Sequence, residues 1–256
     1  MKKATWILFG FLSVIVGLYP IIYFLIDRRF GLLSSKSAEL LNNNLWNISF
    51  YGHIILGGLA LLIGWLQFSP KLRRTNIKLH RIIGKIYIIS VLISGVCGLY
   101  IAFLATGGII SMLGFISLDI IWLTTTILGF TTITKKKIEL HKKLMIYSYS
   151  ACFAAVTLRI WLPILEMSIG NFIIAYRIVA WLSWIPNIIF AYYLTNNRKP
   201  VANLSHINAI RALLFNPKFL SFYKVYVTAE KQMLLFSLIA LIQTRYSQLS
   251  ENAQLQ

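Results

Sequence analysis

Six long apolar runs constrain this chain more strongly than any other feature of its sequence. They lie at about 5–26, 49–68, 82–104, 109–132, 144–165 and 172–194. A helix needs roughly 20 mostly apolar residues to cross the hydrocarbon of a bilayer. The runs lack the alternation of apolar and polar positions that marks membrane β-strands. We therefore expect an all-α membrane protein whose six spans occupy residues 1–194.

The charge balance agrees with a membrane protein. Only 12% of the 256 residues are charged and 58% are hydrophobic, yet the formal net charge is +18. In a soluble protein, such a basic balance would suggest a nucleic-acid partner. Here the basic residues lie in short loops beside the apolar runs. They therefore indicate orientation and contact with anionic lipid, and we expect no nucleic-acid binding.

Basic and neutral loops alternate along the chain. The turns 105–108 and 166–171 contain no Lys or Arg. The basic loops contain Lys71, Arg73, Arg74, Lys78 and Arg81, then Lys135, Lys136, Lys137, Lys142 and Lys143, then Arg198 and Lys199. Because cytoplasmic loops collect Lys and Arg, we expect both termini on the cytoplasmic side of the cell membrane, although Arg28, Arg29 and Lys36 form an exception. The first run is long enough to be an anchor and not a cleaved signal peptide.

The last part of the chain, residues 195–256, is more polar than the rest. Its one apolar stretch, 233–242, is too short to span a membrane, which takes roughly 20 residues. Such a stretch is typical of a helix that lies at the interface or docks on other helices. We therefore expect a cytoplasmic or interfacial tail.

Two of the basic loops resemble each other. Residues 77–81 read IKLHR and residues 138–142 read IELHK, at an offset of 61 positions. Each segment follows a span that runs inward and opens a span that runs outward. This predicts a four-helix core, spans two to five, built from two parallel hairpins, and it would set His80 and His141 at equal depth. A chance likeness between two short basic loops is the alternative.

Several segments together resemble a prokaryotic membrane-protein family, catalogued as domain of unknown function 2306. The pieces that carry the resemblance are His53, Gly64, Gln67 and Phe68, then 79–87 (LHRIIGKIY), His141, 144–146 (LMI) and 157–163 (TLRIWLP). They cover about residues 49–195, and the HR-x-x-G-K-x-Y piece is the most specific. The resemblance implies the membrane topology and no particular activity.

A fainter resemblance is to transmembrane b-type cytochromes that hold two haems in a four-helix core. In those proteins, each hairpin has an outward histidine on its first helix and an inward one on its second. His53 and His80 match the first hairpin, and His141 matches the inward place of the second, where the outward place holds Gly114. The resemblance implies one inner haem b between His80 and His141, with Gly84 leaving room for the macrocycle. Two interfacial histidines are the alternative.

Ionisable residues also lie inside the apolar runs near the outer side. Asp119, Arg159, Arg177 and His53 fall at overlapping depths, given a rise of about 1.5 Å per helical residue. Such residues are costly in a bilayer, so they face the bundle interior and commonly mark a site. The excess of arginine predicts a pocket for an anionic ligand, a carboxylate or a quinone-type oxygen. An Asp119–Arg159 ion pair that only joins two helices is the alternative.

No motif of a soluble enzyme is present, such as a P-loop, GxSxG or HExxH, and whether the chain is an enzyme stays open. Cys97 and Cys152 lie in apolar runs and indicate small buried side chains. Pro186 predicts a kink in the sixth span. The leading hypothesis is a haem-b or quinone-interacting redox protein. The alternatives are a carrier or binding protein for a small anionic solute and a ligand-free membrane scaffold.

Overall fold

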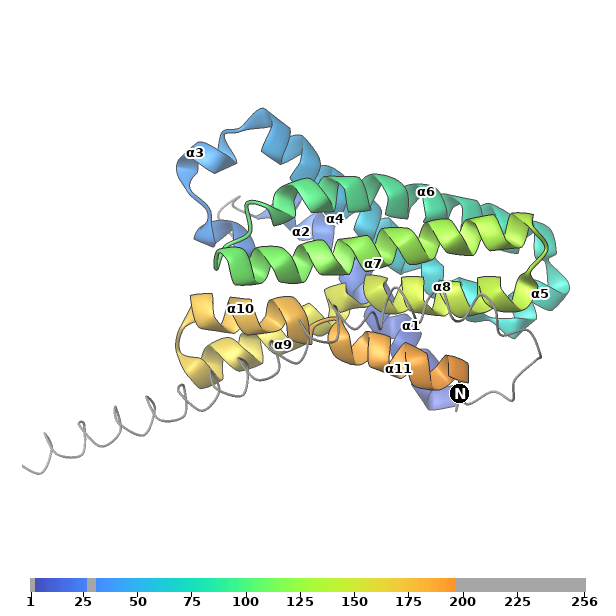
Figure 1. Ribbon diagram of the computed structural model, residues 1–256. Coiled ribbons are helices and arrows are strands. Elements are labelled where there is room, and N and C mark those ends of the chain that lie inside the picture. Colours follow the sequence, from blue (N-terminus) through green and yellow to red (C-terminus); the bar gives the residue numbers. More distant parts are fainter. Residues whose placement is uncertain (1–2, 27–30, 197–256) are drawn as a thin grey trace, which may run out of the picture. The chain divides into compact units, whose positions relative to one another are not determined.

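The computed structural model describes residues 3–26 and 31–196, and these residues form helices joined by short connections (Figure 1). The elements are α1 (Lys3–Leu18), η1 (Tyr19–Ile21), α2 (Ile22–Leu25), η2 (Gly31–Ser35), α3 (Ala38–Leu41), α4 (Asn44–Gly64), η3 (Trp65–Phe68), α5 (Pro70–Thr75), α6 (Ile77–Ala102), α7 (Ile109–Thr134), α8 (Ile138–Cys152), α9 (Ala154–Ile169), α10 (Phe172–Leu182) and α11 (Ile185–Asn196). The expectations for Arg28, Arg29, Arg198, Lys199 and nearly all of the tail fall outside the described residues.

Six helical stretches are long and apolar enough to cross a membrane, which confirms the predicted fold class. They are Lys3–Leu25, Asn44–Phe68, Ile77–Ala102, Ile109–Thr134, Ile138–Ile169 and Phe172–Asn196. Several begin earlier than the apolar runs, because polar caps start the helix before the hydrocarbon-like sequence begins. Asn43 Oδ1 accepts from Trp46 N at 3.0 Å, and Asn76 Oδ1 accepts from Leu79 N at 2.9 Å.

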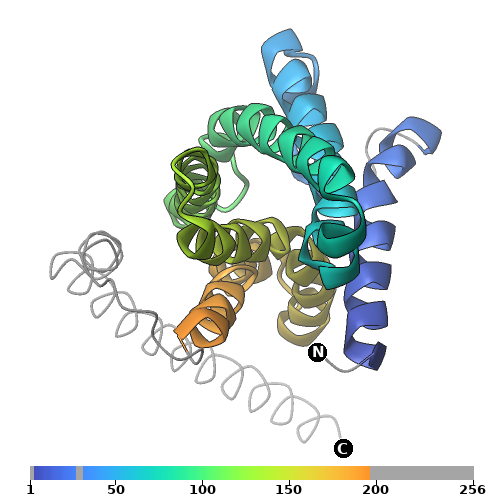
Figure 2. The same ribbon diagram turned by 90° about the vertical axis from the view of Figure 1, so that its right-hand side faces the viewer.

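Four helices surround a common interior. In chain order α4, α6, α7 and α8 each pack on the next, and α8 closes the ring on α4; seen end-on, α1 lies beside α4 (Figure 2). Outside the ring, α10 packs on α9 and α7, and α11 packs on α8. The predicted four-helix core thus has the expected helices as neighbours, while the origin of its two hairpins by duplication stays a prediction.

Spans five and six are each broken near their middle. Span five changes from α8 to α9 at Phe153, and span six changes from α10 to α11 at Ser183 and Trp184, just before Pro186. The two breaks are tied together, because the Thr157 hydroxyl donates to the Ser183 carbonyl. Asn187 Nδ2 donates to the same carbonyl at 3.0 Å and to Thr157 Oγ1 at 3.2 Å. Polar side chains therefore satisfy backbone freed by the break, as a hydrocarbon environment requires.

Glycines let α1 and α8 approach α4 closely. A Cβ on Gly58 would lie 2.7 Å from the Gly17 carbonyl oxygen and 2.9 Å from Pro20 Cγ. A Cβ on Gly64 would lie 2.5 Å from the ring of Tyr149. Small residues at such contacts are the usual means by which membrane helices pack, since lipid offers no hydrophobic drive between them.

A closed chain of hydrogen bonds joins α6, α7 and α8 in the interior. Thr126 Oγ1 donates to the Trp122 carbonyl at 2.7 Å, so it accepts from Ser148 Oγ at 2.6 Å. Ser148 in turn accepts from Tyr87 OH at 2.8 Å, and Tyr87 accepts from Trp122 Nε1 at 3.5 Å. The chain begins and ends on Trp122, and each hydroxyl in it both donates and accepts. We call these four residues the hydroxyl ring.

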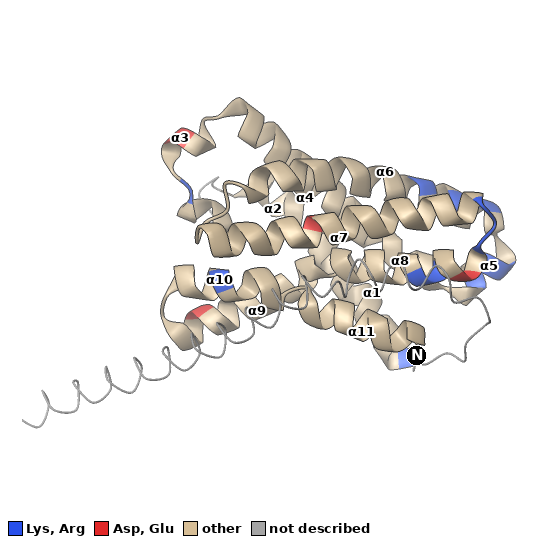
Figure 3. Ribbon diagram, viewed as in Figure 1, with Lys and Arg blue, Asp and Glu red and all other residues tan. Residues whose placement is uncertain are grey.

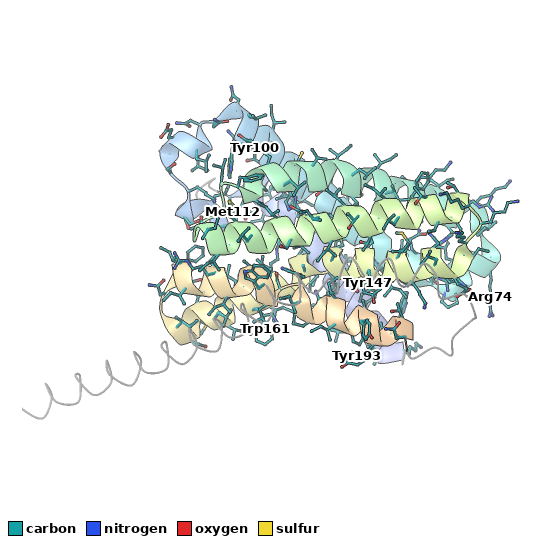
Figure 4. All side chains as sticks on the ribbon, in the orientation of Figure 1. Arg74, Tyr100, Met112, Tyr147, Trp161 and Tyr193 are labelled. Atoms are coloured by element: carbon teal, nitrogen blue, oxygen red, sulfur yellow. The ribbon has the colours of Figure 1, made fainter. Side chains whose placement is uncertain are left out.

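Charged residues and exposed apolar residues occupy different parts of the surface, as expected for a protein in a bilayer. Lys and Arg gather where α5 and the first turns of α6 and α8 lie, an end that we call the basic end (Figure 3). Arg74 projects there, whereas Trp161 on α9 and Tyr193 on α11 point away from the bundle along its length (Figure 4). We call the opposite end, with η2, α3 and the 103–108 connection, the far end. That the basic end is cytoplasmic stays a prediction.

Replacing Ser148 by Ala should lower the stability of the bundle. The change leaves the Tyr87 hydroxyl without an acceptor and Thr126 without a donor in a buried place, at a cost of about 1–2 kcal/mol. Thermal unfolding of the purified protein in detergent measures it. Ser150→Ala, on the same helix, removes a half-buried hydroxyl that bonds to no described residue, and it should leave Tm unchanged. Equal Tm for both variants would contradict a stabilising role for the hydroxyl ring.

Candidate functional site: a polar cavity towards the far end

A cavity of about 220 Å³ lies inside the bundle, from the far end to the level of Trp122. Most of its wall is apolar. The polar or charged side chains on it come from seven elements or connections and are Tyr23, Lys36, Trp46, His53, Asp119, Trp122, Cys152, Arg159 and Tyr176. Three of the four residues predicted from sequence to shape an outer pocket, His53, Asp119 and Arg159, therefore line one cavity.

His53 on α4 is held by α6. Its Nδ1 donates to the Ser94 carbonyl at 3.0 Å, because a carbonyl can only accept, and Ser94 Oγ donates to the His53 carbonyl at 2.9 Å. These bonds fix the ring and place the proton on Nδ1. In the neutral imidazole, Nε2 is then an acceptor. His53 offers the cavity a lone pair from a fixed position.

Asp119 on α7 is 5% exposed and makes no hydrogen bond to any described residue. Its position depends on Gly98 of α6, where a Cβ would lie 2.5 Å from Asp119 Oδ2 and 2.6 Å from His53 Nδ1. Those two atoms are therefore at most 5.1 Å apart, on either side of the missing side chain. Gly98 is what allows a carboxyl group and an imidazole to share this corner of the cavity.

Arg159 on α9 occupies the wall formed with α1. Its guanidinium carbon lies 4.3 Å from the centre of the Tyr19 ring, a cation–π contact. Nη1 donates to the Ala155 carbonyl at 2.9 Å, while Nε is buried without an acceptor. A guanidinium that leaves the Nε edge unpaired retains the geometry that binds a carboxylate with two parallel hydrogen bonds.

The proposed ion pair between Asp119 and Arg159 does not form. Within residues 3–26 and 31–196, no ion pair joins Asp119 to Arg159, whereas Lys142 and Glu139 do form one, at 2.6 Å on the surface of α8. The alternative in which Asp119 and Arg159 only join two helices is therefore wrong for these side chains. Neither side chain is paired with the other, and both line the cavity.

Lys36, in the connection after η2, closes the far end of the cavity. Its Nζ donates to the Leu104 carbonyl at 2.6 Å, and nearby Ser35 Oγ lies 3.0 Å from Thr106 Oγ1. Burial of the ammonium lowers the pKa of Lys36 to about 8. Trp46 lines the same cavity; it is 2% exposed and its Nε1 has no acceptor among the described residues. The cavity thus presents two further donors near its mouth.

Arg177 is not on the cavity, although it was predicted to shape the pocket. Its Nε donates to the Gly107 carbonyl at 2.7 Å, which fixes the turn between α6 and α7. Gly107 and Gly108 have φ of +93° and +72°, so this turn adopts a left-handed backbone that glycine tolerates best. The long side chain therefore bonds to a carbonyl in the connection between α6 and α7 and does not line the cavity.

The predicted haem ligands lie at the basic end. His141 Nδ1 donates to the Gly129 carbonyl at 2.8 Å, which leaves Nε2 free and the ring oriented, as a metal ligand requires. His80 Nδ1 is buried without a partner in the described chain, and the position of a Cβ on Gly84 is 3.5 Å from Gln67 Oε1. His141 therefore fits a haem ligand. His80 lacks a comparable hydrogen bond to orient its ring, and the space beside Gly84 is next to Gln67.

These contacts define a class of protein: a multi-pass helical membrane protein with a mostly apolar cavity, lined by a few ionisable side chains, between spans one to six. The chain belongs to the family described as "Predicted membrane protein (DUF2306)", which matches residues 50–195. No curated protein and no solved structure matches the chain. The family description agrees with the membrane fold and assigns no activity.

Sequence reasoning missed three residues of the cavity, Lys36, Trp46 and Gly98. Lys36 looked like an exception to the charge pattern of the loops, and only the fold shows that it bends over the cavity. Trp46 precedes the apolar run that was used to define the second span. Gly98 had a signal: it follows Ser94 and Ser90 at four-residue intervals, a small and polar stripe on one face of α6.

The lowered pKa of Lys36 predicts a pH-dependent stability. Burying the charged form of Lys36 lowers the free energy of unfolding. This loss of stability is fully present below pH 8 and is relieved as pH rises from about 8 toward the ordinary lysine pKa of 10.5. The Tm of the native protein should therefore rise relative to that of Lys36→Met between pH 8 and pH 10. Thermal unfolding of both proteins at each pH measures this. Lys71→Met, at an exposed lysine, is the control, and a Tm difference for Lys36→Met that stays constant with pH would contradict the expectation.

Proposed function

We propose that this protein binds a small organic anion, of the monocarboxylate class, in the cavity towards the far end. The observation that carries the proposal is the buried guanidinium of Arg159, whose Nε has no acceptor in the described chain although it lines a cavity. A buried charge without a counter-ion is unfavourable, and an anionic ligand supplies both the charge and the missing acceptor.

The size and wall of the cavity restrict the ligand. A volume of about 220 Å³ is below the range of drug-sized pockets. Aromatic side chains line it, with Trp46 and Phe50 stacked at 5.1 Å between ring centres. A single ring or a short chain with one carboxylate matches this space, whereas a long acyl chain exceeds it.

The charges around the cavity also favour an anion. Arg159 and Lys36 each bring a positive charge, against the one carboxyl group of Asp119. Arg159, Lys36 and Trp46, which carry donors, and His53, whose Nε2 is an acceptor, all line the cavity. A carboxylate at Arg159 with its apolar part against the aromatic wall would use most of these groups. Transport and signalling both begin with such binding, so the proposal covers a carrier and a receptor.

Benzoate should stabilise the purified full-length protein, and Arg159→Gln should weaken that effect at least tenfold in affinity. A ligand at 100 times its Kd raises the free energy of unfolding by about 2.7 kcal/mol, and losing a charged hydrogen-bond pair costs about 1.5–3 kcal/mol. Thermal unfolding in detergent, with benzoate and acetate as probes of two sizes, measures the shift.

Arg177→Gln is the matched control, because it removes an arginine that lies outside the cavity. It should keep the benzoate shift even if its own Tm changes. Arg159→Lys, which retains the charge without the two-pronged geometry, should bind with intermediate affinity and shows that the site still folds. No benzoate shift in the native protein, or an equal shift in Arg159→Gln, would overturn the proposal.

A second candidate function is electron transfer through haem b at the basic end. The hydrogen bond from His141 to the Gly129 carbonyl favours it, because it presents Nε2 of a fixed ring. When bound, the haem would supply one-electron chemistry, and His141 and His80 would hold its iron. The fit at His80 is incomplete in this structure, because its Nδ1 has no hydrogen-bond partner among the described residues.

A reduced-minus-oxidised spectrum of the purified protein tests the haem directly. Ligation by His80 and His141 predicts an α-band typical of b-type haem that His141→Ala abolishes. His53→Ala should retain the band, because His53 lies in the cavity towards the other end. A protein that is folded and shows no α-band would exclude the second candidate without affecting the first.

A further inference from the structure

We propose that Asp119 is a proton-binding site that carries its proton at neutral pH. The proton comes from water and forms an O–H bond on one carboxylate oxygen. In this form the side chain is neutral and can donate a hydrogen bond into the cavity. The proposal deepens the proposed function, on which its consequence for the ligand rests, because it names the regulation of the same cavity.

The surroundings of Asp119 do not stabilise a negative charge. The residue lies ten positions into α7, near the middle of a 26-residue span, and is 5% exposed. Among the described residues, none donates a hydrogen bond to its carboxyl group, and no cationic nitrogen lies within 4.0 Å of it. An ion buried in a poor dielectric without a partner costs far more than its neutral form.

His53 is the nearest group that could take the proton instead. Its Nδ1 already donates to the Ser94 carbonyl, so a second proton on Nε2 would make a cation. That cation would form in the field of Arg159, which interacts electrostatically with His53. No comparable cation acts on Asp119 within contact distance. Between two groups at most 5.1 Å apart, the geometry therefore assigns the proton to the carboxyl group.

The other ionisable groups on the cavity leave this assignment unchanged. They are Tyr23 from α2, Lys36 after η2, Cys152 from α8, Arg159 from α9 and Tyr176 from α10, while α6 contributes no ionisable side chain. The phenols and the thiol are neutral at pH 7. Arg159 is turned to Tyr19 and Ala155, and Lys36 is tied to Leu104. None of these groups supplies a bonded counter-ion to Asp119.

The proton matters for the ligand because both would share a small space. An ionised Asp119 would repel a carboxylate brought to Arg159 across a cavity of about 220 Å³. A protonated Asp119 removes the repulsion and can donate to the ligand. Anion and proton then occupy the cavity together, and above the pH at which the proton dissociates, affinity for the anion falls by up to a factor of ten for each unit of pH.

Infrared spectroscopy of the full-length protein without ligand tests the proton site. The native protein at neutral pH should show the C=O stretch of a protonated carboxyl group, and Asp119→Asn should lose it. Glu166→Gln, which changes an exposed carboxyl group on α9, should keep it. Identical spectra for the native protein and Asp119→Asn in this region would overturn the proposal.

Benzoate-induced stabilisation then tests the coupling. At a pH where the band of Asp119 has disappeared, the native protein should have lost at least tenfold in benzoate affinity relative to Asp119→Asn at the same pH. Comparison at one pH cancels the titration of Lys36, which is present in both proteins. An equal affinity would overturn the coupling. If the infrared band shows that Asp119 is protonated but benzoate does not stabilise the protein, the proton site is supported. Only the proposed function is then overturned.

Discussion

The bilayer imposes the constraint on which the rest of this structure depends: a polar group that faces lipid has no partner. The chain meets it by turning polar side chains inward from several helices at once. In the half toward the basic end they satisfy one another in the hydroxyl ring, where each hydroxyl both donates and accepts. In the other half the same inward orientation leaves groups unsatisfied, and those groups surround a cavity. The need to turn polar groups away from lipid therefore accounts for both the hydroxyl ring and the cavity.

Trp122 marks the boundary between the two halves. Its indole N–H and its carbonyl begin and end the hydroxyl ring, and its side chain also lines the cavity. The cavity therefore has a floor held by three helices. Above that floor the ionisable groups are held by different means: His53 by Ser94, Arg159 by Tyr19 and Ala155, and Asp119 in the space left by Gly98. Because Asp119 and Arg159 do not pair with each other, the cavity is a candidate binding site.

Much of this arrangement could be predicted from the sequence, and the failures have physical causes. Hydropathy predicts the spans because the length of an apolar run can be counted directly along the sequence. Helical rise places His53, Asp119 and Arg159 at similar depth, but depth says nothing of direction, so Arg177 was expected in the pocket and instead bonds to Gly107. The break at Phe153 has no proline or glycine to signal it, whereas α9 continues through Pro163. Lys36 depends on the path of a loop, which no periodicity encodes.

The walls of the cavity come from two parts of the chain that can change independently. His53, Asp119 and Arg159 belong to the region 50–195 that matches the family, whereas Tyr23, Leu33, Lys36 and Trp46 precede it. The imidazole, carboxyl and guanidinium groups of the cavity thus lie in the part of the chain that matches the family, and the cover is supplied by the segment before it. Substitutions in that leading segment would change the shape of the cavity without changing its imidazole, carboxyl and guanidinium groups. One scaffold could in this way come to recognise different molecules.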